Sequence, residues 1–108
     1  MGLYKIRRSQ NYQYYWTLSS SNGQVLITSE TYITKDACKN GIASSKTAIL
    51  NSNFDKKIAS NGQYYFNQIA NNYQVLGTSE MYNTSFARDN GVEAVKKEAP
   101  YATVQDLT

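Results

Sequence analysis

The chain has 108 residues, of which 41% are hydrophobic and 13% aromatic, and its net charge is +3. This length suits one domain and is too short for two independent cores, and the apolar content argues against disorder. The charge is too small for a dedicated nucleic-acid arm, no apolar stretch is long enough to span a bilayer, and the single cysteine excludes an internal disulfide.

The chain is an internal duplication. A shift of fifty positions aligns Tyr4–Leu50 with Phe54–Pro100 without a gap and gives about 17 identities, where roughly three would arise by chance. The sequence therefore predicts one domain, residues 1–108, made of two repeats, about 1–52 and 53–108.

Each repeat begins with three segments that are rich in strand-forming residues. The predicted strands lie near Leu3–Arg8, Gln13–Ser19, Gln24–Thr28, Asn53–Ala59, Gln63–Ala70 and Gln74–Thr78. The Asn-Gly pairs at Asn22 and Asn61 are typical of hairpin turns. The two matching turns carry Tyr12 and Tyr73 instead of glycine, and because tyrosine is disfavoured at positive φ, they are expected to differ in geometry.

A helix follows the strands in each repeat. Thr34 and Thr84 are the predicted N-caps, and the helices are expected to run to about Ile49 and Glu98. A glycine inside a helix costs about 1 kcal/mol relative to alanine. Its presence at the same place in both helices therefore predicts close approach to the sheet. After Pro100, residues 101–107 alternate apolar and polar types and predict a last strand.

The repeats resemble the YegP-like family of small bacterial proteins. The similarity rests on Asn22–Leu26, Thr28–Tyr32, Thr78–Tyr82, Arg88–Val92 and Val95–Pro100. The resemblance implies an α+β fold in which two β-β-β-α-β units form one continuous, mainly antiparallel sheet. Two helices would pack on this sheet, and the units would exchange their closing strands with pseudo-two-fold symmetry. It implies no known activity. Gln68 departs from the family, which usually has an apolar residue there.

The residue types argue against common catalytic chemistry. The chain has no histidine, one cysteine and no phosphate-binding glycine motif. We therefore predict a non-enzymatic protein without cofactor or metal. The alternative is an enzyme that uses Glu, Lys or Tyr. Cys38 aligns with Arg88, so its side chain is expected to be partly exposed, and a redox role would require a lowered thiol pKa.

Several polar residues recur in both repeats. The Thr-Ser-Glu stretch could supply an acid, a base or a cation ligand, but such residues at a strand end more often satisfy free backbone groups. An asparagine inside a helix is unfavourable and is expected to bond a neighbouring turn. A structural role is therefore predicted for Thr28, Ser29, Glu30, Asn40, Gly41, Thr78, Ser79, Glu80, Asn90 and Gly91.

Strand alternation predicts an open sheet face that carries cations and aromatic rings. The residues expected there are Lys5, Arg7, Tyr15, Lys57 and Tyr65. This face is either a solvated surface or a weak, low-specificity site for nucleic acid or another polyanion. We predict an interaction module whose partner is a nucleic acid or a protein. We also predict a cytoplasmic monomer without membrane contact, because the duplication supplies what a single unit would obtain by dimerising.

Overall fold

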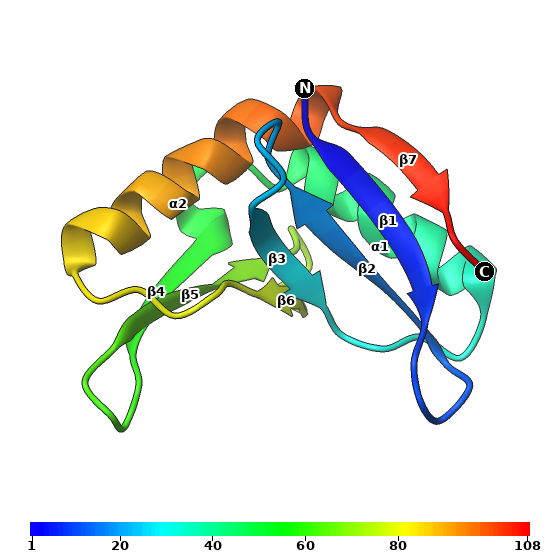
Figure 1. The fold of residues 1–108 in the computed structure, drawn as a ribbon, viewed down its shortest axis with the longest axis horizontal. Helices are drawn as coiled ribbons and strands as arrows, with labels where there is room; N and C mark the ends of the chain where they lie inside the picture. The colour runs from blue at the N-terminus through cyan, green and yellow to red at the C-terminus, as the bar shows by residue number, and fades with distance from the viewer.

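The computed structural model describes residues 1–108 as one seven-stranded sheet with two helices (Figure 1). The elements are β1 (Leu3–Arg8), β2 (Tyr14–Ser19), β3 (Val25–Ser29), α1 (Lys35–Thr47), η1 (Asn51–Asn53), β4 (Phe54–Ile58), β5 (Tyr64–Ile69), β6 (Val75–Thr78), α2 (Ser85–Glu98), η2 (Ala99–Tyr101) and β7 (Thr103–Asp106). The strand order is β4-β5-β6-β3-β2-β1-β7, and every pair is antiparallel except β1 with β7. The predicted α+β fold class is confirmed. The helices are too short and too polar to span a bilayer.

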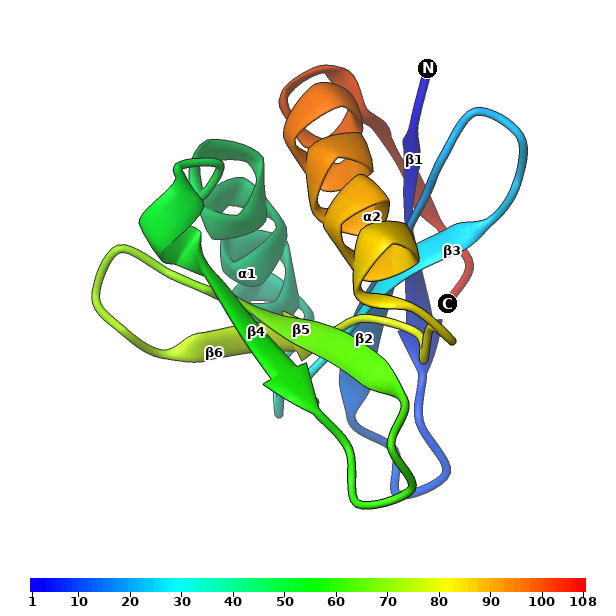
Figure 2. The same cartoon turned by 90° about the vertical axis from the view of Figure 1, so that its left-hand side faces the viewer.

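The two repeats meet at the antiparallel pair formed by β3 and β6. Thr28 lies opposite Thr78 there, so a pseudo-two-fold axis passes between equivalent residues. Both helices lie on the same face of the sheet (Figure 2). Each helix contacts the second strand of its own repeat and the third strand of the other repeat. The repeats therefore share one core.

The exchange of closing strands occurs once. β7 belongs to the second repeat but pairs with β1 of the first (Figure 1). The first repeat passes from α1 through η1 directly into β4, so β4 has no eighth strand beside it. The short linker between α1 and β4 leaves no residues for a second closing strand. Lys35 on α1 holds β7 through an ion pair with Asp106 at 2.9 Å.

The predicted helix caps are confirmed. The hydroxyl oxygens of Thr34 and Thr84 accept hydrogen bonds from the backbone N–H groups of Ala37, at 3.1 Å, and Ala87, at 3.0 Å. A methyl group at Gly41 would collide with the ring and hydroxyl of Tyr32. The helix glycines thus allow the close approach that the sequence predicts.

The expectation that the tyrosine turns differ from the glycine turns is wrong. Tyr12 has φ 64° and Tyr73 has φ 71°, in the same left-handed region as Gly23 and Gly62. All four turns also share a backbone bond, such as that from Tyr73 N–H to the Ala70 carbonyl oxygen at 2.9 Å. Before each of these residues stands an asparagine whose side chain accepts from the N–H of the next glutamine. This bond holds the turn, and it offsets a left-handed penalty of about 1–2 kcal/mol.

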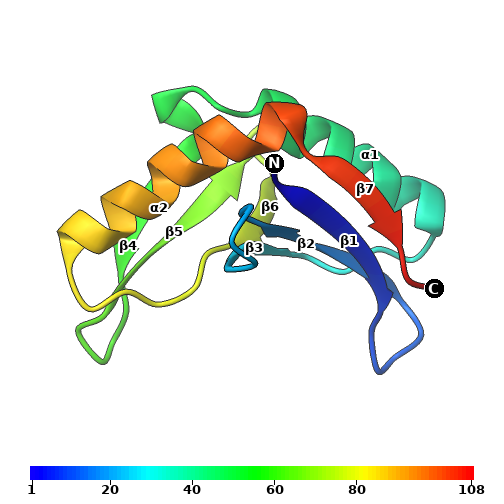
Figure 3. The same cartoon turned by 45° about the horizontal axis from the view of Figure 1, so that its top comes forward.

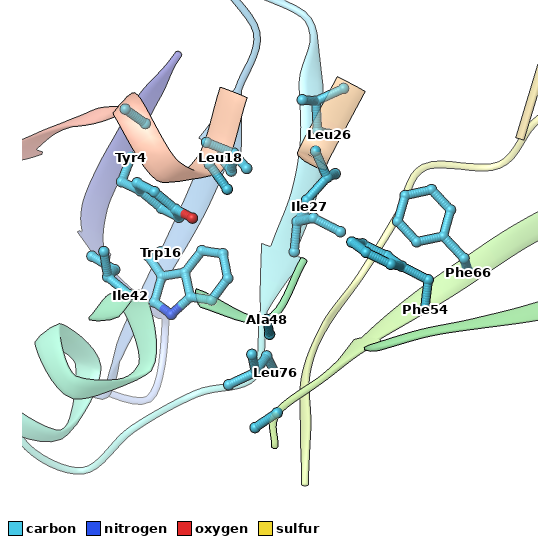
Figure 4. Packing of buried hydrophobic residues seen from close by; sticks show 14 of the residues in the cluster. Tyr4, Trp16, Leu18, Leu26, Ile27, Ile42, Ala48, Phe54, Phe66 and Leu76 are labelled. Atoms are coloured by element: carbon cyan, nitrogen blue, oxygen red, sulfur yellow. The ribbon is translucent and has the colours of Figure 1, made fainter. Parts of the chain in front are cut away.

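The core is one cluster of 17 buried hydrophobic residues (Figure 4). In the first repeat Tyr4 meets Trp16 edge to face, with ring centroids 5.3 Å apart, and in the second Phe54 meets Phe66 in the same way at 5.8 Å. Beside the pseudo-two-fold axis, the equivalent positions Ile27 and Gly77 differ in side-chain size. A Cβ atom on Gly77 would lie 2.7 Å from Ile27 Cγ2 and 2.6 Å from the Thr28 carbonyl oxygen. Only one of the two equivalent positions can therefore hold a side chain.

Gln68 is fully buried and forms a polar network beneath α1. Its Nε2 donates to the carbonyl oxygens of Ser45, at 3.0 Å, and Ala48, at 3.1 Å, and its Oε1 accepts from the Ser45 hydroxyl at 2.8 Å. The Tyr4 hydroxyl bonds the same Ser45 hydroxyl at 2.8 Å. Both N–H groups and the oxygen of the amide thus have a partner, which removes most of the cost of burying it.

Candidate functional site

The helix-free face of the sheet holds all five residues of the predicted binding surface. Lys5 and Arg7 lie on β1, Tyr15 lies opposite Arg7 on β2, and on the other side of the sheet Tyr65 of β5 lies opposite Lys57 of β4. The buried residues of these strands, such as Trp16 and Phe66, alternate with them and point to the helices. The five side chains are half-buried.

The structure does not bring these five residues together. The pairing register places Thr17, Thr28, Thr78 and Asn67 in one row across the middle of the face. Tyr15 lies two residues to one side of this row and Tyr65 two residues to the other, because β2 and β5 run in opposite directions. In a flat sheet their separation would be roughly 20 Å. The hairpins that carry them diverge at opposite ends of the molecule (Figure 3).

The two corners differ in charge. Lys5 and Arg7, with Tyr15, make up what we call the first corner, and neither cation forms an ion pair. At the second corner, Lys57 forms an ion pair with Asp55 at 3.3 Å. Asp55 is the counterpart of Lys5, so the repeats place opposite charges at equivalent positions. The positive character of the face therefore lies at the first corner.

In the repeated Thr-Ser-Glu stretch, the serine of each copy bonds the backbone. Ser29 Oγ accepts from the Trp16 N–H at 2.8 Å and donates to the Glu30 carbonyl oxygen at 2.7 Å. Ser79 makes the same two bonds with Phe66 N–H and the Glu80 carbonyl oxygen, at 2.9 and 2.8 Å. Each serine replaces a backbone partner where the strand pairing ends. Thr28 and Thr78 lie on the open face, while Glu30 and Glu80 are exposed.

Asn40 and Asn90 do not bond a neighbouring turn, contrary to the expectation. Both are exposed in the interior of a helix, and neither side chain forms a hydrogen bond within the protein. They line two clefts, Asn90 with Gly91 in one and Asn40 with Gly41 in the other. Sequence reasoning missed these clefts, because each lies between a helix of one repeat and the third strand of the other.

Cys38 is fully buried, so the expectation of partial exposure is wrong. Burial raises the pKa of the thiol to about 11, and the charge of Asp106 on β7 adds to this increase. The equivalent Arg88 lies at the edge that has no closing strand, and its guanidinium extends over the Tyr64 ring at 5.2 Å. A thiol with a raised pKa is a poor nucleophile at neutral pH.

No group of three or more His, Cys, Asp or Glu side chains is placed to hold a metal ion. The largest hollow, about 500 Å³, lies between α1 and the β1–β7 edge and has an apolar floor formed by Ile6, Ile42 and Val104. Lys39 and Lys46 border this hollow opposite Asp106. Its geometry offers no nucleophile and base in contact.

The fold and its paired features define a class of protein, a tandem-repeat α+β protein with pseudo-two-fold symmetry. The chain belongs to the family described as "Domain of unknown function (DUF1508)", whose model matches residues 9–50 and 59–106 in two segments. Proteins named YegP are among the relatives of the chain, so the resemblance to the YegP-like family is confirmed.

Individual relatives agree with this assignment. A UPF0339 protein of Acinetobacter baylyi is 41% identical over 99% of this chain and 97% of its own length. One of Photorhabdus laumondii is 50% identical over 41% of this chain, a match that spans only 39% of that protein. The solution structure of a UPF0339 protein of Shewanella oneidensis has a TM-score of 0.92 and 40% identity, covering 99% of this chain and 92% of that one. The solution structure of Escherichia coli yegP, described as a protein of unknown function, has the same TM-score at 37% identity, covering 99% and 93%.

Proposed function

We propose that this protein is a non-enzymatic binding module and that the first corner of its open sheet face binds single-stranded nucleic acid weakly. The observation that supports this proposal is the cross-strand placement of Arg7 beside Tyr15, with Lys5 on the same face and no ion pair to either cation. Cations hold phosphates, while a tyrosine ring stacks on a base with little sequence preference. A module of this kind acts as a monomer, since one chain already contains both repeats.

Two cations can neutralise only a few phosphates, so the interaction is weak. We expect a Kd in the ordinary non-specific range of about 10⁻⁴ to 10⁻⁶ M at physiological salt. With two phosphate contacts, the slope of log K against log salt should be about −1.4 for a single strand.

The test is a fluorescence anisotropy titration of labelled single-stranded RNA and DNA at two salt concentrations. Lys5→Glu with Arg7→Glu should abolish binding. Lys39→Glu with Lys46→Glu changes the net charge equally on α1 and is the matched control, which should retain most of the affinity. The proposal fails if no binding appears at low salt, or if both double variants weaken it equally. Light scattering after size exclusion would separately contradict the monomer if a dimer dominates at micromolar concentration.

A further inference from the structure

The two clefts that contain Asn90 and Asn40 are equivalent sites related by the pseudo-two-fold axis. Cleft A lies between α2 and β3, with a volume of about 300 Å³, and is lined by Gln24, Leu26, Tyr82, Ala87, Asn90 and Gly91 together with Ala94. Cleft B lies between α1 and β6, with a volume of about 230 Å³, and a shift of fifty gives the matching residue for each of the seven. Ala70 and Asn72 also line cleft B. Each cleft therefore needs both repeats.

The lining has stayed the same while the repeats diverged elsewhere. Six of the seven pairs are identical, and only Ala94 differs, with Ser44 in cleft B. Of the other forty or so aligned positions, only about 11 are identical. Even core positions have changed, as Trp16 and Phe66 show. Sharing a fold therefore does not by itself explain the identical linings.

Packing explains part of this identity. Each tyrosine hydroxyl lies against the helix glycine of its own repeat, so the Tyr82–Gly91 and Tyr32–Gly41 pairs must be kept together. Burial raises the pKa of both tyrosines. The Tyr82 hydroxyl is buried and has no hydrogen-bond partner within the protein. It is the one buried polar atom in the wall of cleft A without a partner.

Packing does not explain the amides. The side chains of Asn40, Asn90, Gln24 and Gln74 are exposed and form no hydrogen bond within the protein. Asparagine in the interior of a helix lowers its stability relative to alanine, because its side chain competes for backbone groups. An unfavourable residue at the same place in both helices, with no partner in the protein, points to a partner outside it.

The chemistry of the walls defines the class of that partner. No charged residue lines either cleft, Leu26 or Leu76 provides an apolar wall, and the amides present donors and acceptors together. We propose that both clefts bind an uncharged, planar ligand that carries a hydrogen-bond donor beside an acceptor. Nucleobases and primary amides share this chemistry, and asparagine and glutamine pair with it through two bonds. The volumes lie at or below the lower end for small-ligand sites, so the ligand is small.

The test is a ¹H–¹⁵N NMR titration of the full chain with adenosine in one arm and acetamide in the other. We expect saturable shifts at Gly41 and Gly91 and at the side-chain amides of both asparagines, with two ligands bound per chain. Saturation by adenosine would identify the ligand as a nucleobase, and saturation by acetamide would identify it as a primary amide. If neither ligand gives saturable shifts, or if the shifts lie outside the clefts, the proposal is overturned.

The duplication supplies an internal control. Asn90→Ala should weaken binding in cleft A about tenfold and leave cleft B unchanged, and Asn40→Ala should do the reverse. Alanine favours the helix, so both variants will fold. Gln10→Ala removes an exposed amide outside the clefts and should change neither site. Equal shifts in all three variants would overturn the proposal.

Salt separates this inference from the function proposed for the sheet face. Binding in uncharged clefts should be the same at both salt concentrations, whereas phosphate binding at the first corner should fall with a slope of about −1.4 in log K against log salt. A cleft signal that falls with salt would contradict an uncharged site. Either proposal, the one for the sheet face or the one for the clefts, can therefore be contradicted while the other stands.

Discussion

The two helices occupy equivalent places on the sheet but rest on different chemistry. On α1, Ser45 bonds the side chains of Tyr4 and Gln68 from the sheet, whereas the equivalent residues are Val95 on α2 and Phe54 and Leu18 on the sheet. Both sets are buried and similar in shape. The fold therefore requires side chains of this volume at these positions. These side chains can be polar when each polar group has a hydrogen-bond partner.

The largest effect is expected beside the pseudo-two-fold axis, where Ile27 of the first repeat packs against its own counterpart, Gly77. Gly77→Ala should lower the free energy of unfolding by about 3 kcal/mol, because the new methyl group meets both the Thr28 backbone and Ile27. Equilibrium urea denaturation measures this change. Ile27→Val, which only removes a methyl group, should cost about 1 kcal/mol and is the control. A loss below 1 kcal/mol for Gly77→Ala would contradict the steric account.

A medium effect should follow from breaking the polar network under α1. Gln68→Leu alone should destabilise the protein by about 2 kcal/mol, because it leaves the Ala48 carbonyl oxygen and the Ser45 hydroxyl short of partners. The triple variant Tyr4→Phe, Ser45→Val and Gln68→Leu gives α1 the side chains that α2 already uses. It removes the Ser45 hydroxyl that Gln68→Leu leaves short of a partner, so its stability in urea denaturation should recover by about 1 kcal/mol, while the Ala48 carbonyl oxygen still lacks its donor. A triple variant as unstable as Gln68→Leu would show that α1 needs its network.

The smallest effect concerns an acid that only the second repeat has. Glu98 accepts from the Ser21 N–H at 2.7 Å and from the Ser21 hydroxyl at 3.0 Å, and these bonds, the backbone one foremost, lower the pKa of its carboxyl group. A lowered folded-state pKa gives stability that is full above the unfolded value of about 4.3 and is lost as pH falls through the folded value.

Glu98→Gln should therefore cost about 1 kcal/mol or less at pH 7 and flatten the loss of stability below pH 5. Thermal melts from pH 7 to pH 3 measure both effects. The counterpart of Glu98 is Ala48, which has no titrating group, so no equivalent loss arises in the first repeat. If the variant loses stability below pH 5 as steeply as the parent does, that loss is due to other carboxylates. One such group is Asp106, whose pKa is lowered by hydrogen bonds from Thr108 and by Lys35.

Local features could be predicted from the sequence. The repeat, the strands and the N-caps Thr34 and Thr84 depend on periodicity and on side chains close to the groups they bond, and the structure confirms them. The turns at Tyr12 and Tyr73 could not be predicted from glycine preference alone. The preceding asparagine decides their conformation, and Asn-x-Gln in all four turns was the available signal.

Features that depend on distant pairing could not be predicted. Strand parity placed Tyr15 and Tyr65 on one face, but only the β3–β6 register shows that they lie at opposite corners. Cys38 is fully buried on the side of the sheet where β7 pairs with β1, and residue alignment with Arg88 contains no information about that strand. The clefts could not be predicted for the same reason. The available signal was the recurrence of Asn40 and Asn90 without a structural need.

The crossing of each helix onto the other repeat governs how the molecule opens. In a solenoid, each repeat contacts only its neighbours and can lose order separately. Here α2 contacts β3 and α1 contacts β6, so detaching one helix uncovers apolar surface in both halves. Amide hydrogens in the interiors of the two helices should therefore exchange with solvent at one common rate, set by opening of the whole chain.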